Sequence, residues 1–222
     1  MDCPDFSAEE VRDTFRFIEP VNRWFGGHRP LTAFFERESR AWDPTHTIHI
    51  LDAGCGSGDV PAALVRWARR TGRSIRVHAI DNNADTVRLA RRQCSAYPEI
   101  TVSQADVFDL RGAPADYVTA SMFVHHFPNE TVPALFEHLL AHCRRKVIIN
   151  DLLRSPLAYL ATWLFSLPAS RVFRHDARLS VRRGFSVEEL HRLLLASGYA
   201  HYRLETHFFY RFLLILSKEA TS

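Results

Sequence analysis

The stretch that decides the fold is Ile50-Leu-Asp-Ala-Gly-Cys-Gly-Ser-Gly-Asp59, in which every second residue from position 54 to position 58 is glycine. It follows an apolar run, residues 47–53, that predicts a strand. It precedes residues 59–70, whose apolar residues recur at helical spacing. Glycine at a strand-to-helix turn permits tight backbone geometry and lets a ligand lie against the main chain. The turn therefore predicts a binding site for a small molecule.

The charge of this turn narrows the ligand. A dinucleotide fingerprint, GxGxxG, requires glycine at position 59, where this chain has Asp59. Asp52 lies two residues before the first glycine and adds a second negative charge. Two carboxylates are unfavourable beside a pyrophosphate, whereas they suit a ligand that carries an ammonium or a sulfonium group. The sequence therefore favours a cationic ligand over a dinucleotide.

The rest of the chain continues the alternation of strand and helix. Strands are predicted at residues 47–53, 74–81, 100–105, 116–121 and 145–150, and helices at 59–70, 85–94 and 131–143. Ser186-Val-Glu-Glu is a capping box that opens a further helix, and Gly198 is a plausible stop. The β-rich runs 199–206 and 208–216 are too close for a helical crossover, so they should pair antiparallel.

These elements predict an α/β fold with a doubly wound, mostly parallel, seven-stranded Rossmann-like sheet whose last strand is antiparallel. Residues 1–45 are expected to form an N-terminal helical cap on the sheet edge or over a pocket, because they are rich in aromatic residues. Residues 46–222 form the main domain, in which residues 155–183 are an insertion between the fifth strand and the last helix.

Composition excludes several classes of protein. The chain has 222 residues, 46% hydrophobic and 24% charged, as is usual for a globular protein, and its net charge of +3 is too small to imply nucleic acid. The four cysteines form no CxxC pair, so we expect neither zinc nor disulfides but a reduced, cytoplasmic protein. The start lacks the pattern of a signal peptide. The longest apolar run, residues 156–169, is shorter than the ~20 residues of a membrane-spanning helix.

In this context, Leu51-Asp-Ala-Gly-Cys-Gly-Ser-Gly58 closely resembles the first motif of class I S-adenosylmethionine-dependent methyltransferases, and the resemblance extends over roughly residues 47–216. It implies S-adenosyl-L-methionine as cofactor and no metal. In that family an acidic residue after the second strand binds the ribose, the segment after the third strand contacts adenine, and the segment after the fourth flanks the methionine moiety. The resemblance thus predicts these cofactor-binding residues: Asp52, Gly54, Cys55, Gly56, Gly58, Asp81, Asn82, Asp106, Val107 and Ser121.

The same resemblance extends to small bacterial methyltransferases found with secondary-metabolite or polyketide pathways, and more distantly to ubiquinone and menaquinone methyltransferases. Where the small bacterial group usually has His-Asp-Gly-Pro, this chain has His175-Asp-Ala-Arg178, which leaves the shape of that loop open.

Histidines on the acceptor side are candidates for a catalytic base. His175 beside Asp176 is the first, since a carboxylate can orient a histidine base, and His125 is the second, with His126 as its neighbour. The apolar part of residues 155–183 suits a lid over an aromatic or aliphatic acceptor, or a helix that packs on the N-terminal cap. The arginines of residues 171–183 form a solvated face or bind an anionic acceptor.

The leading hypothesis is a methyltransferase acting on a small, fairly apolar metabolite, at a phenolic or related hydroxyl. A carbon acceptor of quinol-like or polyketide-like structure is the alternative. An RNA or protein methyltransferase and a non-catalytic cofactor-binding partner are alternatives from other classes. Scarce lysine and the absence of an Asn/Asp-Pro-Pro-Tyr-type motif after residue 121 disfavour an RNA or protein methyltransferase. The intact cofactor motifs disfavour a non-catalytic partner.

Overall fold

The fold of this computed structural model is a seven-stranded sheet in the order β3-β2-β1-β4-β5-β7-β6. The structure describes residues 27–165, 171–199, 201–207 and 210–217, and within helices α6 and α7 several side chains are also outside the description. The strands are β1 (Ile48–Ala53), β2 (Ile75–Asp81), β3 (Ile100–Gln104), β4 (Ala115–Ser121), β5 (Cys143–Leu152), β6 (Tyr202–His207) and β7 (Arg211–Ser217).

Strands β1 to β5 pair in parallel, and β7 pairs antiparallel with both β5 and β6. The predicted fold class is therefore confirmed, including the antiparallel last strand. Because β7 runs against its neighbours, its first residue, Arg211, lies opposite Leu152 at the end of β5. The start of β7 thus belongs to the same edge of the sheet as the carboxyl ends of the parallel strands.

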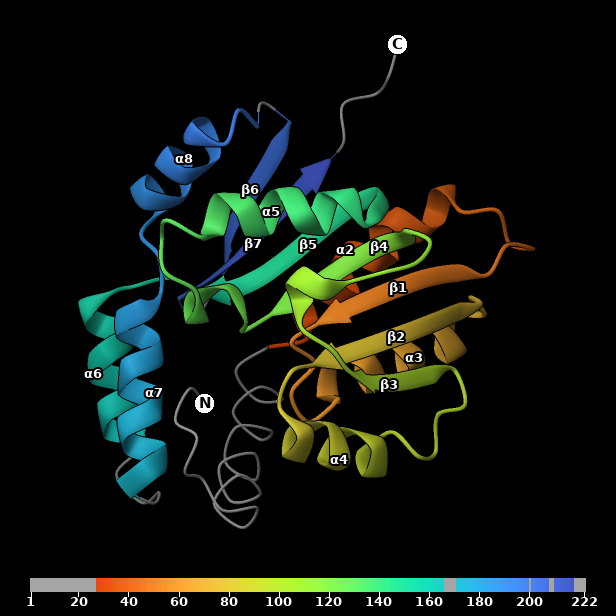
Figure 1. The fold of residues 1–222 in the computed structure, drawn as a ribbon, viewed down its shortest axis with the longest axis horizontal. Helices are drawn as coiled ribbons and strands as arrows, with labels where there is room; N and C mark the ends of the chain where they lie inside the picture. The colour runs from red at the N-terminus through yellow and green to blue at the C-terminus, as the bar shows by residue number, and fades with distance from the viewer. Residues whose placement is uncertain (1–26, 166–170, 200, 208–209, 218–222) are drawn as a thin grey trace.

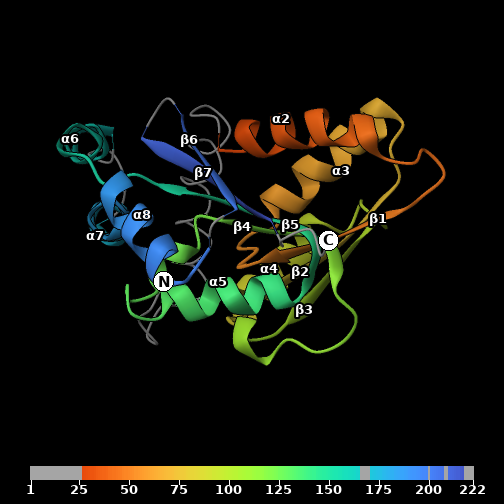
Figure 2. The same cartoon turned by 90° about the horizontal axis from the view of Figure 1, so that it is seen from above.

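Helices cover both faces of the sheet (Figure 2). They are α2 (Arg29–Glu38), α3 (Asp59–Thr71), α4 (Ala84–Gln93), α5 (Val132–Ala141), α6 (Pro156–Phe165), α7 (Arg171–Arg183) and α8 (Val187–Ala196), with short 3-10 helices η1 (Ser39–Ala41), η2 (Val107–Asp109) and η3 (Val124–His126). One core cluster lies under α2 and α3 and is rich in aromatic rings, a second lies under α5 and α8, and a smaller third packs α4 on β2 and β3. The predicted capping box is present: Ser186 Oγ accepts from the Glu189 N–H, and Glu189 Oε2 accepts from the Ser186 N–H.

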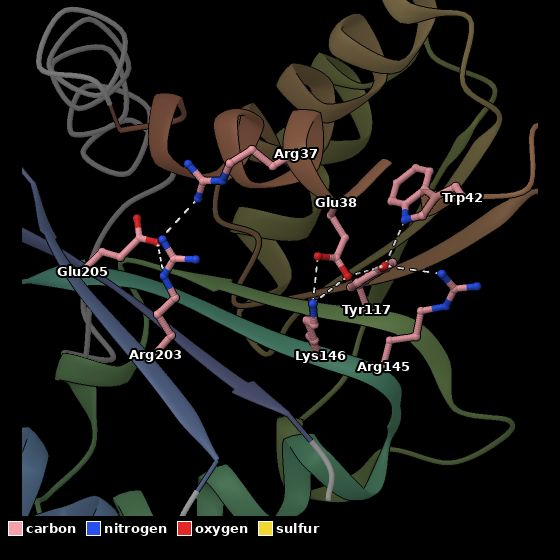
Figure 3. Close-up of polar contacts among 8 residues, drawn as sticks. All are labelled: Arg37, Glu38, Trp42, Tyr117, Arg145, Lys146, Arg203 and Glu205. Atoms are coloured by element: carbon pink, nitrogen blue, oxygen red, sulfur yellow. Dashed lines mark hydrogen bonds and ion pairs between the residues drawn. The ribbon is translucent and has the colours of Figure 1, made fainter. Parts of the chain in front are cut away.

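A polar network holds α2 and the segment after it against the sheet (Figure 3). Trp42 Nε1 donates to the hydroxyl of Tyr117 at 2.9 Å, and that hydroxyl lies 3.1 Å from Glu38 Oε1. Lys146 Nζ reaches both carboxylate oxygens of Glu38 at 2.8 Å. Of the predicted cap over residues 1–45, the part from residue 27 onward therefore packs on the sheet face, while Phe15, Phe17 and Trp24 lie outside the described residues.

The insertion after β5 forms two helices, α6 and α7, that lie beside each other beyond the carboxyl ends of the parallel strands (Figure 1). After them the chain makes an isolated bridge between Leu153 and Phe185 and enters α8. Among the described residues, no helix is long and apolar enough to cross a bilayer. The insertion thus puts helical side chains next to the edge of the sheet where ligands of open α/β sheets bind.

Candidate cofactor and acceptor site

A cavity of about 620 Å³ opens at the carboxyl edge of the sheet. Its walls come from the turns after β1 to β4, the end of β5, the start of β7, and helices α6 and α7. Nine of the ten predicted cofactor residues line it: Asp52, Gly54, Cys55, Gly56, Asp81, Asn82, Asp106, Val107 and Ser121. The landmarks of four different turns thus converge on one cavity of the size that ligand sites usually have.

The glycine loop is shaped by close packing and by the next turn. At Gly54 φ is +67°, and a Cβ there would lie 2.0 Å from Cδ2 of Phe123, so the ring of Phe123 fills the place of a side chain. The Gly56 N–H donates to Asp81 Oδ2 at 3.1 Å, and the Asn83 N–H donates to Asp81 Oδ1 at 3.0 Å. Asp81 therefore holds two turns together in addition to lining the cavity.

Gly58, the remaining predicted cofactor residue, is not among the described residues that line the cavity. Its φ is +85°, and a Cβ there would lie 2.6 Å from the Cys94 sulfur. Its role in this structure is to let the start of α3 approach α4. Cys55 is buried, and burial raises the pKa of its thiol well above the ordinary value, so its contribution to the cavity is not a thiolate.

Negative charge is concentrated around the glycine loop. Asp52 is fully buried, and burial, with the nearby charges of Asp59 and Asp81, raises its pKa to about 7. A hydrogen bond from Thr119 Oγ1 at 2.6 Å opposes this shift. Burial also raises the pKa of Asp81. Ionisation of Asp52 is therefore costly until a positive charge enters the cavity, and the site favours a cationic ligand.

The residues after β2 to β4 complete the predicted cofactor side. Asp106 is exposed, and its carboxylate accepts from the Phe108 N–H at 2.9 Å, which caps η2. Val107 is buried beneath it. Asn82 is exposed and lies next to the end of β3, where its carbonyl accepts from Gln104 Nε2 at 3.0 Å. Ser121 Oγ accepts from Asn150 Nδ2 at 3.0 Å. Asp106 thus has a local structural role as well as a position in the cavity wall.

A buried histidine–carboxylate pair lies at the junction of β4 and β5. His125 Nδ1 is 2.7 Å from Asp151 Oδ1, and the side chains are 2% and 0% exposed. Asp151 Oδ2 also accepts from the Phe123 N–H at 3.1 Å and from the His125 N–H at 3.2 Å. Burial alone would raise the pKa of Asp151, but the charge and hydrogen bonds of His125 and the Leu152 N–H outweigh it and hold that pKa below its usual value.

The tautomer of His125 follows from its contact with Asp151. Because an ionised carboxylate only accepts hydrogen bonds, Nδ1 is the donor in this pair, and in the neutral form of the ring the lone pair lies on Nε2. Nε2 is buried and has no hydrogen-bond partner among the described residues, while His125 lines the cavity. A buried polar atom without a partner in the protein is expected to bond a ligand or water.

Beyond His125, the cavity is walled by the insertion and by β7. Thr162 of α6 and Ala177, Ser180 and Val181 of α7 line it together with Leu152. Arg211 also lines it. Its guanidinium is buried, which lowers its pKa, whereas the charges of Asp151 and Asp59 act to raise it. This end of the cavity therefore combines an apolar wall with one buried cation.

Of the two histidines predicted as a base, the structure describes the surroundings of His125 only. His175 and Asp176 lie in α7, whose inner residues line the cavity, but their side chains are outside the description. The partner of His125 is Asp151, which the sequence places only at the end of a strand. The polar ends of two strands that become neighbours in the sheet are the signal that points to this pair. Among the described residues, no group of three or more His, Cys, Asp or Glu could hold a metal ion.

Comparison with known proteins shows a match to one family model. Residues 50–146, which include the glycine loop and the turns after β2 to β4, match the family model described as "Methyltransferase domain". No curated protein sequence matches the chain significantly. The family match covers the segment that carries all ten predicted cofactor residues.

Solved structures of methyltransferases share the fold. Magnesium protoporphyrin IX methyltransferase from Synechocystis PCC 6803, solved with bound SAH, is 19% identical over 91% of this chain and 88% of its own, with a TM-score of 0.63. The plantazolicin methyltransferase BamL, in complex with a triazolic desmethylPZN analog and SAH, is 15% identical over 96% and 91%, with a TM-score of 0.73. The citrinin polyketide synthase CMeT domain is 14% identical over 85% and 51%, with a TM-score of 0.65.

Proposed function

The chain has the fold of class I S-adenosylmethionine-dependent methyltransferases, and we propose that it transfers the cofactor's methyl group to a hydroxyl of a small, fairly apolar metabolite. The observation that carries the proposal is His125, which lines the cavity and whose buried Nε2 has no hydrogen-bond partner among the described residues, while Asp151 holds the opposite nitrogen at 2.7 Å. A phenolic hydroxyl must lose its proton as the methyl group arrives, and a positioned base supports that step.

The cofactor side of the proposal rests on charge. When bound, S-adenosylmethionine supplies an activated methyl group on a cationic sulfur, and it also carries an ammonium group. Asp52, Asp59 and Asp81 line the cavity and provide negative charge for such a ligand. Asp81 is proposed to bind the ribose hydroxyls, and Asp106 with Val107 the adenine. The enzyme's main task is then to position the acceptor behind the methyl group and to exclude water.

The acceptor side rests on shape and polarity. Val181, Ala177 and Leu152 provide an apolar wall, and Arg211 provides a buried positive charge that can stabilise a developing phenolate. The neighbours include the CMeT domain of a citrinin polyketide synthase and a plantazolicin methyltransferase in complex with a triazolic desmethylPZN analog, and both names are consistent with such an acceptor. A carbon acceptor activated by an adjacent hydroxyl remains the second candidate, because removal of the same proton by His125 would prepare it as well.

The test is incubation of the protein with methyl-labelled S-adenosylmethionine and a panel of phenols, hydroquinones, RNA and protein, with the product located by mass spectrometry and NMR. We expect the label on the oxygen of an aromatic acceptor and stoichiometric release of S-adenosylhomocysteine. Label on a ring carbon would show that the enzyme methylates carbon and not oxygen. Label on RNA or protein would refute the small-molecule acceptor. Cofactor binding without methyl transfer to any member of the panel would refute the proposed acceptor class.

The identity of the base is tested separately, because two candidates remain. His125→Ala and His175→Ala are compared for turnover and for cofactor affinity under the same conditions. We expect His125→Ala to lower turnover by about 10²–10⁴-fold with little change in affinity. If only His175→Ala has that effect, the base is His175 with Asp176, as the sequence first suggested.

A further inference from the structure

Helix α6 is an apolar helix that lies at the surface. Its sequence, Pro156-Leu-Ala-Tyr-Leu-Ala-Thr-Trp-Leu-Phe165, contains no charged residue. None of its described side chains is buried, and Leu157, Leu160 and Trp163 are 62%, 52% and 40% exposed. These three residues are spaced by three along the helix and so follow one side of it. A helix of this composition is normally buried, so its exposed side is expected to meet a partner.

Helix α7 supplies a positive charge next to that apolar side. It contains five arginines and one aspartate. The guanidinium of Arg178 lies 6.0 Å from the ring centre of Trp163, and that of Arg182 lies 5.8 Å from the ring centre of Tyr159. Arg182 and Arg183 are exposed. The two helices lie side by side at the outer end of the molecule in both views (Figures 1 and 2). The two ring contacts join the arginines of α7 to the apolar residues of α6 in one surface.

The chemistry of this surface selects among possible partners. A second copy of the chain would bring arginine-rich helices against each other across a twofold axis, which like charge disfavours. Nucleic acid would meet the arginines but would leave the exposed leucines without a suitable contact. An anionic bilayer satisfies both groups, since leucine and tryptophan enter the boundary between headgroups and acyl chains while arginines meet the lipid phosphates.

We propose that this protein binds the surface of anionic membranes through α6 and α7. With 10 residues, α6 is about 15 Å long, half the hydrocarbon thickness, so it lies in the plane of the interface and does not span it. The surface is defined by Leu157, Leu160 and Trp163 of α6 and by the exposed arginines of α7. This inference is independent of the methyl acceptor. Membrane binding would place α6 and α7, whose other residues line the cavity, directly on the lipid.

The experiment is flotation of the full-length protein with vesicles of phosphatidylcholine alone and of phosphatidylcholine with about one-third phosphatidylglycerol. We expect binding to the anionic vesicles, weak binding to the neutral ones, and release of much of the protein when salt is raised from ~0.1 to ~0.5 M, because salt screens the arginine contribution. No flotation with anionic vesicles at low salt would overturn the proposal.

Two matched pairs of variants separate the apolar from the charged contribution. Leu157→Ser with Leu160→Ser should lower binding to anionic vesicles by roughly tenfold or more. Leu195→Ser, which alters the 72%-exposed leucine of α8, should leave it unchanged. Arg182→Gln with Arg183→Gln should lower it by about tenfold, whereas Arg40→Gln with Arg92→Gln, exposed arginines elsewhere, should have a small effect.

Each protein is also measured for cofactor affinity, melting temperature and mass in solution without lipid. Equal flotation of the leucine variant and of Leu195→Ser would show that α6 does not carry the binding. A wild-type dimer that the leucine substitutions convert to monomer, together with no flotation, would instead assign this surface to a second copy of the chain.

Discussion

Two polar clusters of this protein lie at opposite ends of the same central strands and differ in how completely their polar atoms are hydrogen-bonded. Around Tyr117, near the start of β4, the indole N–H of Trp42 has an acceptor, and Glu38 accepts from Lys146 (Figure 3). Around His125, beyond the end of β4, Asp151 is fully bonded but His125 Nε2 has no partner among the described residues. The first cluster fixes a helix on the sheet, whereas in the proposed function the second keeps one polar atom for the acceptor. The proposal therefore assigns a structural role to the first cluster and a catalytic role to the second.

The largest expected effect lies in the unsatisfied cluster. His125→Ala should lower the turnover number by about 10²–10⁴-fold, while the cofactor affinity measured by calorimetry should change little, because the base acts on the acceptor. His78→Gln is the control, since its Nε2 already bonds Ser103 Oγ at 3.0 Å and His78 is not among the described residues that line the cavity. An equal loss in both variants would indicate a general effect of histidine removal.

The second effect concerns a buried carboxylate without a cation. Asp52 has a pKa of about 7 in the folded protein, against ~3.9 in an unfolded chain, so its ionisation destabilises the ligand-free fold as the pH rises between these values. Asp52→Asn removes that cost. Above pH ~7 it should increase the free energy of unfolding by about 2–4 kcal/mol, and below pH ~4 the gain should disappear. Denaturant titrations at both pH values measure the difference, and a gain at neither would contradict the account of Asp52.

The same carboxylate should control cofactor affinity. A cationic ligand favours the ionised form of Asp52, so the affinity of the wild-type protein for S-adenosylmethionine should rise as the pH increases through about 7. In Asp52→Asn the affinity should be lower, and this part of the pH dependence should be absent. Calorimetric titrations across that range test the link, and parallel pH profiles of the two proteins would break it.

The third effect lies in the satisfied cluster and should change stability alone. Tyr117→Phe deletes the hydroxyl that pairs with Trp42 and Glu38, at a cost of about 1–3 kcal/mol of unfolding free energy. Turnover should be unchanged at temperatures where the variant is folded. Tyr97→Phe is the control, because its hydroxyl bonds only the exposed Arg66 among the described residues, and it should cost less. Loss of activity in folded Tyr117→Phe would remove the distinction between the clusters.

The smallest effect is expected at the rim of the satisfied cluster. Glu205 contacts Arg37 at 3.5 Å and Arg203 at 2.7 Å, and both arginines are at least half exposed. Exposed ion pairs contribute about 0–1 kcal/mol and are screened by salt. Glu205→Gln should therefore change the unfolding free energy by less than about 1 kcal/mol at low salt, and by even less at high salt. A larger cost would mean that α2 depends on this contact.

The sequence predicted the parts of the site that depend on local pattern. Asp52, Asp81 and the glycines lie in motifs next to their strands, and alternation of strand and helix is enough to bring those motifs to one edge. The pairing of His125 with Asp151 could not be predicted in the same way, because it requires knowing that β4 and β5 are neighbours in register. Arg211 enters the cavity only because β7 runs antiparallel and starts at that edge.

The insertion at residues 155–183 also has a feature that the sequence alone could not predict. Its apolar composition predicts a helix that covers something, and Thr162 does line the cavity. Composition alone does not tell which side of the helix faces inward, so the exposure of Leu157 and Leu160 appears only in the structure.

The most direct test of the account is the dependence of the His125→Ala defect on the acidity of the acceptor. A base is needed only when the hydroxyl is still protonated as the methyl group arrives, so wild-type and variant single-turnover rates are compared on related phenols of decreasing pKa. We predict a loss of about 10²–10⁴-fold for an ordinary phenol and a loss near zero for a phenol that is ionised at the assay pH. The same loss for both phenols would contradict a role for His125 as the base.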